Sequence, residues 1–170
     1  MKTNSGSKSE GTSSLAEAIA AHRFVAKMKP EHLSRLVDVA MFKQFKVDEI
    51  IFREGDRANR FYLICQGKIA LETSRDNEAA PLIQMLGEDE VLGWSWLFPP
   101  YYWHFTARAV EPAKAIFFYG TRLREECDDD PAFGYDLMKR VAAVVIKRLQ
   151  ISRAQSLQLQ LEASRRVSPN

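Results

Sequence analysis

The residues between Met41 and Gly120 break into short runs that are rich in β-branched and aromatic side chains. Most of these runs are separated by Gly, Asp, Asn or Pro, as in the pieces FREGD and CQGK. Short strands at such spacing are typical of antiparallel sandwiches and barrels, whereas alternating strands and helices would indicate a parallel sheet. We therefore expect a mainly β protein, an antiparallel β-roll (double-stranded β-helix, jelly-roll-like) with about eight strands.

Helical patterns flank these runs on both sides. Apolar residues recur every three or four positions from Leu15, and a second short helix begins after the break at Pro30. Residues 1–14 are polar and rich in Ser, Gly and Lys, which predicts a disordered N-terminal tail. We expect a domain of helices and β-roll over residues 15–131, followed by one long helix over residues 132–166.

The long C-terminal helix carries two apolar faces. Its residues contain no proline, and Gly134, their one glycine, lies near the start. The residues with the four-three spacing of a coiled-coil seam are Met138, Ala142, Val145, Leu149, Ser152, Ser156, Leu159 and Ala163. The second face comprises Leu137, Val141, Val144 and Ile151. We expect the seam to pair two copies in a parallel homodimer and the second face to pack on the β-domain. A single helix wrapped on its own domain is the alternative.

Composition and charge favour an ordinary globular protein. The net charge of +2 is too small to indicate nucleic acid or an anionic membrane as a partner. No apolar run approaches the ~20 residues of a membrane span, and no signal-peptide pattern opens the chain. Cys65 and Cys127 lack metal-ligand spacing, so we expect reduced thiols in a cytoplasmic protein, with a single disulfide as the alternative.

The sequence offers little for catalysis. His104 is the only histidine among the expected strands, whereas a metal site inside a β-barrel needs two or three histidines with a carboxylate. No G-x-S-x-G nucleophile motif occurs either. We therefore expect no metal, no catalytic residues and no enzyme activity.

The segment Phe52–Glu72, FREGDRANRFYLICQGKIALE, resembles the signature of cyclic-nucleotide-binding domains. The matching residues are Gly55, Asp56, Asn59, Phe61, Tyr62, Ile64, Gly67 and Ile69. The order of N-terminal helices, β-roll, short helix and long helix also matches, from about residue 15 to 162. The ligand-sensing domains of the Crp/Fnr regulators are similar throughout this range.

This resemblance implies a ligand site called the phosphate-binding cassette. In the family, a Glu in a short turn and helix binds the ribose hydroxyl, and an Arg on the way to the next strand pairs with the cyclic phosphate. The long helix adds polar contacts to the base, so that ligand binding reorients it.

The corresponding stretch here, VLGWSWLFPPYYWHFTARA from Val91 to Ala109, holds all three tryptophans of the chain. When Leu92-Gly93 is aligned on the family's turn, Trp94 stands in place of the Glu. When Ala107-Arg108-Ala109 is aligned on the following strand, Trp103 stands in place of the phosphate Arg. His104 then takes the Ser/Thr position, and Arg108 takes a later position that is often basic. On the long helix, Ser152 falls where a base-contacting hydroxyl is expected, with Arg153 beside it.

The candidate ligand-binding residues are therefore Leu92, Gly93, Trp94, Ser95, Trp96, Leu97, Trp103, His104, Phe105, Arg108, Ser152 and Arg153. Without the cation, the binding free energy of a buried phosphate would be weaker by ~2–5 kcal/mol, so we do not expect cAMP to bind by the usual contacts. Four possibilities stay open. The rings fill the roll, they stack around a small aromatic or apolar ligand, they form a docking surface for an unidentified protein, or Arg108 or Arg153 supports a cyclic nucleotide by new contacts.

The resemblance thus implies a stand-alone, non-catalytic sensor domain whose pocket occupancy controls the geometry of a helical dimer. A scaffold protein with a self-filled pocket is the alternative. In the Crp/Fnr regulators a helix-turn-helix domain follows the long helix, whereas only VSPN follows here, so we expect no DNA binding by that route.

Overall fold

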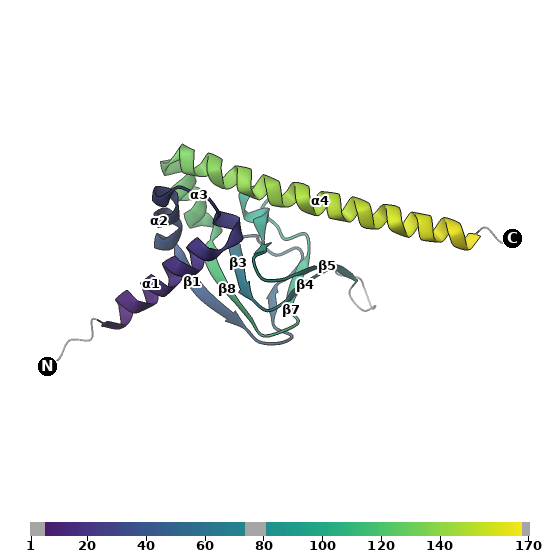
Figure 1. Cartoon of the computed structure of the whole chain (residues 1–170), viewed down its shortest axis with the longest axis horizontal. Coiled ribbons are helices and arrows are strands. Elements are labelled where there is room, and N and C mark those ends of the chain that lie inside the picture. The colour runs from purple at the N-terminus through teal and green to yellow at the C-terminus, as the bar shows by residue number, and fades with distance from the viewer. Residues whose placement is uncertain (1–5, 74–80, 168–170) are drawn as a thin grey trace. The chain divides into compact units, whose positions relative to one another are not determined.

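Within the described residues, eight antiparallel strands form two four-stranded sheets, which confirms the predicted β-roll (Figure 1). The computed structural model describes residues 6–73 and 81–167. The strands of the first sheet are ordered β1-β8-β3-β6 and those of the second β2-β7-β4-β5. The strands are β1 Ala40–Phe45, β2 Ile50–Phe52, β3 Arg60–Gln66, β4 Ile69–Glu72, β5 Leu82–Leu86, β6 Val91–Leu92, β7 Thr106–Ala109 and β8 Ala113–Tyr119.

The hydrophobic core draws side chains from both sheets. On β7, Ala107 and Ala109 are fully buried in the core, whereas Thr106 and Arg108 are only half-buried. Successive residues of a strand point to opposite faces of the sheet, so Arg108 lies on the face away from the core. This alternation decides what each candidate residue on β7 can contact.

Strand β3 is buried on both of its faces. Tyr62 and Ile64 belong to the core cluster, and Phe61 and Leu63 are buried on the opposite face. The ring of Phe61 packs edge-on against Phe24, with a centroid distance of 5.4 Å. Burial on both sides explains why this strand is a continuous apolar run rather than an alternating one.

Helices cover the outer face of the first sheet. They are α1 (Gly6–Ala21), the 3₁₀ helix η1 (Arg23–Val25), α2 (Pro30–Asp38) and α3 (Gly120–Asp129). Both α1 and α2 contact β1, and α3 contacts β8. Helix α2 begins with Pro30 in its first turn, where the missing backbone N–H leaves no hydrogen bond unmade.

Helix α1 begins at Gly6, whereas the sequence predicted a disordered tail over residues 1–14. The structure thus differs from that prediction at residues 6–14, and residues 1–5 lie outside the described part of the chain. The physical reason is the cooperativity of helices. Once the amphipathic part from Leu15 is helical, each preceding residue can add a backbone hydrogen bond without a new nucleation step.

His22 connects the N-terminal helices to β3. Its Nδ1 accepts a hydrogen bond from the backbone N–H of Phe24 at 3.1 Å, which caps η1, and its Nε2 lies 3.2 Å from the carbonyl oxygen of Ile64. Since Nδ1 accepts, the proton of the neutral ring is on Nε2, which donates to Ile64. Burial lowers the pKa of His22 below 6.5, against the opposing charge of Asp89.

The chain divides into two compact units, Met1–Tyr135 and Asp136–Asn170. Helix α4 (Pro131–Val167) accounts for the second unit within the described residues and agrees with the predicted helix over residues 132–166. It starts at a cap in which Asp130 Oδ1 accepts hydrogen bonds from the backbone N–H groups of Ala132 and Phe133. These hydrogen bonds lower the pKa of Asp130.

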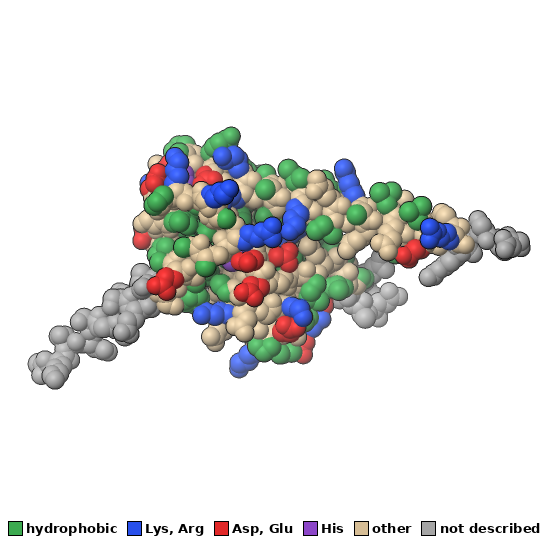
Figure 2. Space-filling model, in the orientation of Figure 1, with side chains coloured by type: hydrophobic (Ala, Val, Ile, Leu, Met, Phe, Trp, Pro, Cys, Tyr) green, Lys and Arg blue, Asp and Glu red, His purple; other side chains and the backbone are tan. Residues whose placement is uncertain are grey.

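The expected seam of α4 is open to solvent. Val145 is half-buried, and the other seven seam residues are exposed. Figure 2 shows hydrophobic side chains at intervals along the surface of this helix. On the second face, Leu137 and Val141 are buried and Ile151 is exposed. Among the described residues, no helix combines the length and the apolar character that crossing a membrane requires.

Candidate ligand-binding site

The cassette comprises β6, the 3₁₀ helix η2 (Trp94–Leu97), the connection that follows, and β7. Gly93 joins β6 to η2 with a φ of 88°, in the left-handed region that glycine adopts without strain. A Cβ atom at this position would lie 2.9 Å from the ring of Trp103 and 3.0 Å from the carbonyl oxygen of Arg60. The close approach of the Trp103 ring therefore requires glycine here.

Trp103, which stands in place of the phosphate Arg, is part of the hydrophobic core. Its backbone is fixed by hydrogen bonds from Gly55 N–H to the Trp103 carbonyl and from Trp103 N–H to the Asp56 carbonyl, both 2.9 Å long. The indole stacks on the ring of Phe52, with centroids 3.9 Å apart and an interplanar angle of 14°, and is 4% exposed. A neutral, packed ring thus takes the place of a cation.

Trp96 is fully buried in a different layer of the molecule. Its ring lies against Phe61, with a centroid distance of 5.9 Å, and its Cβ is 2.8 Å from the position that a Cβ on Gly120 would take. The Trp96 carbonyl accepts a hydrogen bond from Arg124 Nη1 at 2.5 Å, which ties η2 to α3. Its Nε1 is buried and has no hydrogen-bond partner among the described residues.

Trp96 and Trp103 therefore lie on opposite faces of β3. Trp96 packs on Phe61, and Trp103 belongs to the core cluster with Tyr62, the next residue of the same strand. The hypothesis of a single ligand stacked among Trp94, Trp96 and Trp103 needs these rings on one side. For these two rings, the geometry favours the alternative in which the aromatic side chains fill the interior of the protein.

The remaining cassette residues differ in exposure. Leu92 and Gly93 are buried, Trp94, Ser95 and Leu97 are half-buried, and His104 is exposed. Phe105 is half-buried and packs against the core cluster. Of the predicted cassette residues from Leu92 to Phe105, those with side chains accessible to a ligand are thus Trp94, Ser95, Leu97, His104 and Phe105.

Arg108 is engaged in an ion-pair network on the outer face of the second sheet. Its Nη2 pairs with Oε1 of Glu72, and its Nε donates to Glu72 Oε2 at 3.2 Å. Its Nη1 contacts Asp48 Oδ1 at 2.8 Å. These hydrogen bonds, above all those to Glu72, raise the pKa of Arg108. Two carboxylates thus already neutralise the guanidinium, which makes it a poor substitute for the phosphate Arg.

Ser152 and Arg153 lie on α4, in the second unit, and both are exposed. Sequence reasoning missed a different group of residues, which line a hollow on the first sheet around Arg60 and Tyr62. The available signal was the polar Arg60 at the start of an otherwise apolar strand. The other lining residues come from β1 and β8, so their proximity depends on strand pairing that the sequence pattern does not reveal.

Two further observations concern catalysis. No group of three or more His, Cys, Asp or Glu side chains in the described ranges could hold a metal ion. Cys65 and Cys127 are both free thiols. Burial raises the pKa of both thiols, that of Cys127 to about 11, so both are protonated and weakly nucleophilic near neutral pH.

Residues 42–130, more than half of the chain, match the model of the cyclic nucleotide-binding domain. This range includes the signature segment, the cassette and α3. The chain belongs to the cyclic nucleotide-binding domain family. The match confirms the resemblance inferred from Phe52–Glu72, and domains of this family are typically regulatory and non-catalytic.

Solved structures of similar proteins agree with this assignment. A Geobacter metallireducens protein assigned to the cyclic nucleotide-binding proteins is 30% identical, with a TM-score of 0.72 over 79% of this chain and 97% of that one. A cyclic nucleotide-binding domain from Methylobacillus flagellatus is 15% identical, with a TM-score of 0.73 over 88% and 84%. The regulatory subunit of a cAMP-independent protein kinase A from Trypanosoma brucei is 16% identical, with a TM-score of 0.66 over 81% and 49%.

Proposed function

We propose that this chain is a non-catalytic regulatory domain of the cyclic nucleotide-binding family that does not hold a cyclic nucleotide by the family's usual contacts. The observation that carries this proposal is the buried stack of Trp103 on Phe52. It occupies the place in which the family resemblance puts the phosphate-binding Arg. The domain responds instead to another small aromatic or apolar ligand, or to a protein partner.

The argument is electrostatic. A cyclic phosphate that enters a largely dry pocket needs a cation, and its absence reduces affinity by ~2–5 kcal/mol, or roughly 30-fold to several thousand-fold. The indole of Trp103 carries no charge, and Arg108 is paired with Glu72 and Asp48 on the outer face. Moving Arg108 to a ligand would leave Glu72, which is 9% exposed, without its partner.

The Trypanosoma brucei structure supports the proposal in one respect. It is the regulatory subunit of a cAMP-independent protein kinase A, so this fold occurs in the regulator of a kinase that does not depend on cAMP. The fold alone therefore does not require the present domain to bind cAMP.

The output of the domain, in this proposal, is the self-association of α4. Its seam exposes apolar side chains such as Leu149 and Leu159, which a second copy would cover. Ser152 lies within the seam and Arg153 next to it, so a change at these residues would alter dimer geometry. A separate partner protein would then detect that change.

The decisive experiment is a calorimetric titration of the purified protein with cAMP and, separately, with cGMP. We expect no heat of binding for either nucleotide up to about 1 mM. Micromolar binding of either one would contradict the proposal. In that case the variants Arg108→Gln and Arg153→Gln would show which guanidinium replaces the missing one.

A further inference from the structure

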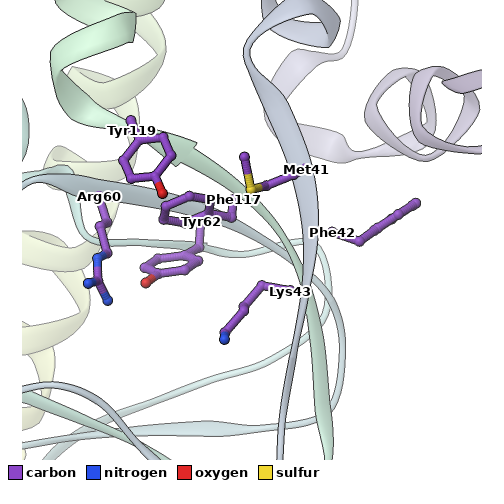
Figure 3. A pocket seen from close by; sticks show the side chains of 7 residues that line it. All are labelled: Met41, Phe42, Lys43, Arg60, Tyr62, Phe117 and Tyr119. Carbon is purple, nitrogen blue, oxygen red and sulfur yellow. The ribbon is translucent and has the colours of Figure 1, made fainter. Parts of the chain in front are cut away.

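A hollow of about 230 Å³ lies on the first sheet of the roll, and none of the residues that line it is one of the predicted cassette residues (Figure 3). We call it the Arg60 hollow. Three neighbouring strands, β1, β8 and β3, supply all of its lining. The lining residues are Met41, Phe42, Lys43, Arg60, Tyr62, Phe117 and Tyr119.

Strand register explains why a hollow forms here. Met41 and Tyr62 both pair with Phe117, so these three residues make one row across the sheet. In the next row Lys43 pairs with Ala115, whose small side chain leaves room beside the lysine. On the other side of the first row, Arg60 pairs with Tyr119.

The floor of the Arg60 hollow is aromatic and rigid. Tyr62 and Phe117 are buried members of the core cluster, with ring centroids 5.4 Å apart. Tyr119 packs edge-on against Phe117 at 4.6 Å and is itself half exposed. Since Tyr62 and Phe117 are 1% and 8% exposed, a flat ring placed here would contact mainly Tyr119, which is held in position by Phe117.

The rim of the hollow is positively charged. Arg60 and Lys43 are exposed, and among the described residues neither forms an ion pair with a carboxylate. In Figure 3 the guanidinium of Arg60 lies beside the hydroxyl of Tyr62, and Lys43 extends its ammonium group from the β1 side. The negative charge of Glu49 also contributes to raising the pKa of Tyr62. This carboxylate is itself engaged, because its Oε2 accepts a hydrogen bond from the backbone N–H of Lys46.

We propose that the Arg60 hollow binds a small anionic ligand with a single ring, such as an aromatic carboxylate or an aromatic phosphate monoester. Lys43 and Arg60 bind the anionic group, and the ring packs against the exposed ring of Tyr119. The volume is below the roughly 300–1,000 Å³ of sites for drug-sized ligands, which limits the ligand to about one ring. This site shares no lining residue with the predicted cassette and does not depend on the function proposed for the cassette.

The test uses phenyl phosphate, benzoate and inorganic phosphate as probes in calorimetric titrations of the full chain. We expect phenyl phosphate or benzoate to bind with a Kd on the order of 1 mM, as suits a ligand of this size. Inorganic phosphate should bind at least several-fold more weakly because it buries no ring. The absence of heat for both aromatic probes at about ten times that concentration would overturn the proposal.

Matched variants identify the site. The double variant Lys43→Met/Arg60→Gln should weaken phenyl phosphate binding by about tenfold or more, since it removes both cations. Lys46→Met removes an exposed lysine just beyond the end of β1 and should leave the affinity unchanged. Equal binding by the double variant and the wild type would place the probe elsewhere and refute the proposal. Lys43 and Arg60 are exposed, so both variants should fold, which circular dichroism would check.

The same titrations distinguish this proposal from the one made for the cassette. Trp94→Ala should not change phenyl phosphate binding, because Trp94 does not line the Arg60 hollow. Conversely, the Lys43→Met/Arg60→Gln variant should respond to cAMP and cGMP as the wild type does. A loss of phenyl phosphate binding in Trp94→Ala alone would mean that the probe occupies the cassette, and would overturn the Arg60 hollow as its site.

Discussion

Gly93 and Gly55 have nearly the same positive φ angle but very different surroundings. Their φ angles are 88° and 84°, so an added side chain strains both positions. A Cβ on Gly93 would also collide with Trp103 and with the Arg60 carbonyl, whereas a Cβ on Gly55 would meet no atom within 4 Å. Substitutions at Gly55 and Gly93 therefore distinguish the cost of backbone strain, which both share, from the cost of disturbed packing, which arises at Gly93 alone.

We predict that Gly93→Ala lowers the free energy of unfolding by about 2–4 kcal/mol, and Gly55→Ala by about 1 kcal/mol. Urea denaturation of the two variants and the wild type would measure both values. Equal decreases in the unfolding free energy of the two variants would show that the Trp103 ring can move away without a loss of stability. Such a result would argue against a rigid cassette.

At the scale of single residues, the sequence predicted positions better than orientations. Alignment of the cassette identified Gly93, Trp94 and Trp103 as its special residues. It did not reveal that Trp96 and Trp103 lie on opposite faces of β3, because η2 and the irregular connection after it have no period from which a face can be read. Nor did it reveal the pairing of Arg108, whose partners lie 36 and 60 residues away along the chain.

At the scale of elements, the seam of α4 can be tested with two exposed apolar residues. Leu149 lies on the seam and is 49% exposed, and Ile151 lies on the second face and is 40% exposed. They are two residues apart on one helix, so their side chains point to nearly opposite sides. In a single chain, a charged side chain at either position would stay in contact with water. In a parallel dimer, by contrast, position 149 would be buried.

We predict that Leu149→Glu shifts the protein from dimer to monomer, whereas Ile151→Glu leaves the dimer intact. Sedimentation velocity over a range of concentrations would measure the change. Dissociation by Ile151→Glu alone would assign the interface to the second face. A wild-type protein that is monomeric at all concentrations would exclude the homodimer.

The elements themselves were largely predictable. Short β-rich runs with turn residues indicated the β-roll, and the proline-free end of the chain indicated α4 to within a residue at each end. The start of α1 was missed because Ser, Gly and Lys do not favour a helix by themselves, and a helix that is already nucleated can extend over them.

At the scale of the whole molecule, stability should depend on pH through His22. Burial lowers the pKa of His22 in the folded protein below 6.5, so the unfolded chain binds the proton more readily. The unfolding free energy should therefore decrease as the pH falls through 6.5, until the folded protein is protonated as well. Protonation would also remove the Nδ1 acceptor that caps η1 at Phe24.

Urea denaturation at pH 7.5 and pH 5.5 would measure this loss. We predict that the unfolding free energy of His22→Gln depends less on pH than that of the wild type. His104→Gln, which removes an exposed histidine, should retain the wild-type dependence. An identical loss in the wild type and His22→Gln would show that other groups cause it.

The separate environments of the three tryptophans give the protein an optical property. An indole in apolar surroundings emits fluorescence at shorter wavelengths than one in contact with water. Trp96 and Trp103 are buried and Trp94 is half-buried, so the long-wavelength part of the emission comes mainly from Trp94. A compound that shifts this part in the wild type but not in Trp94→Phe would thus be detected at the cassette without any added label.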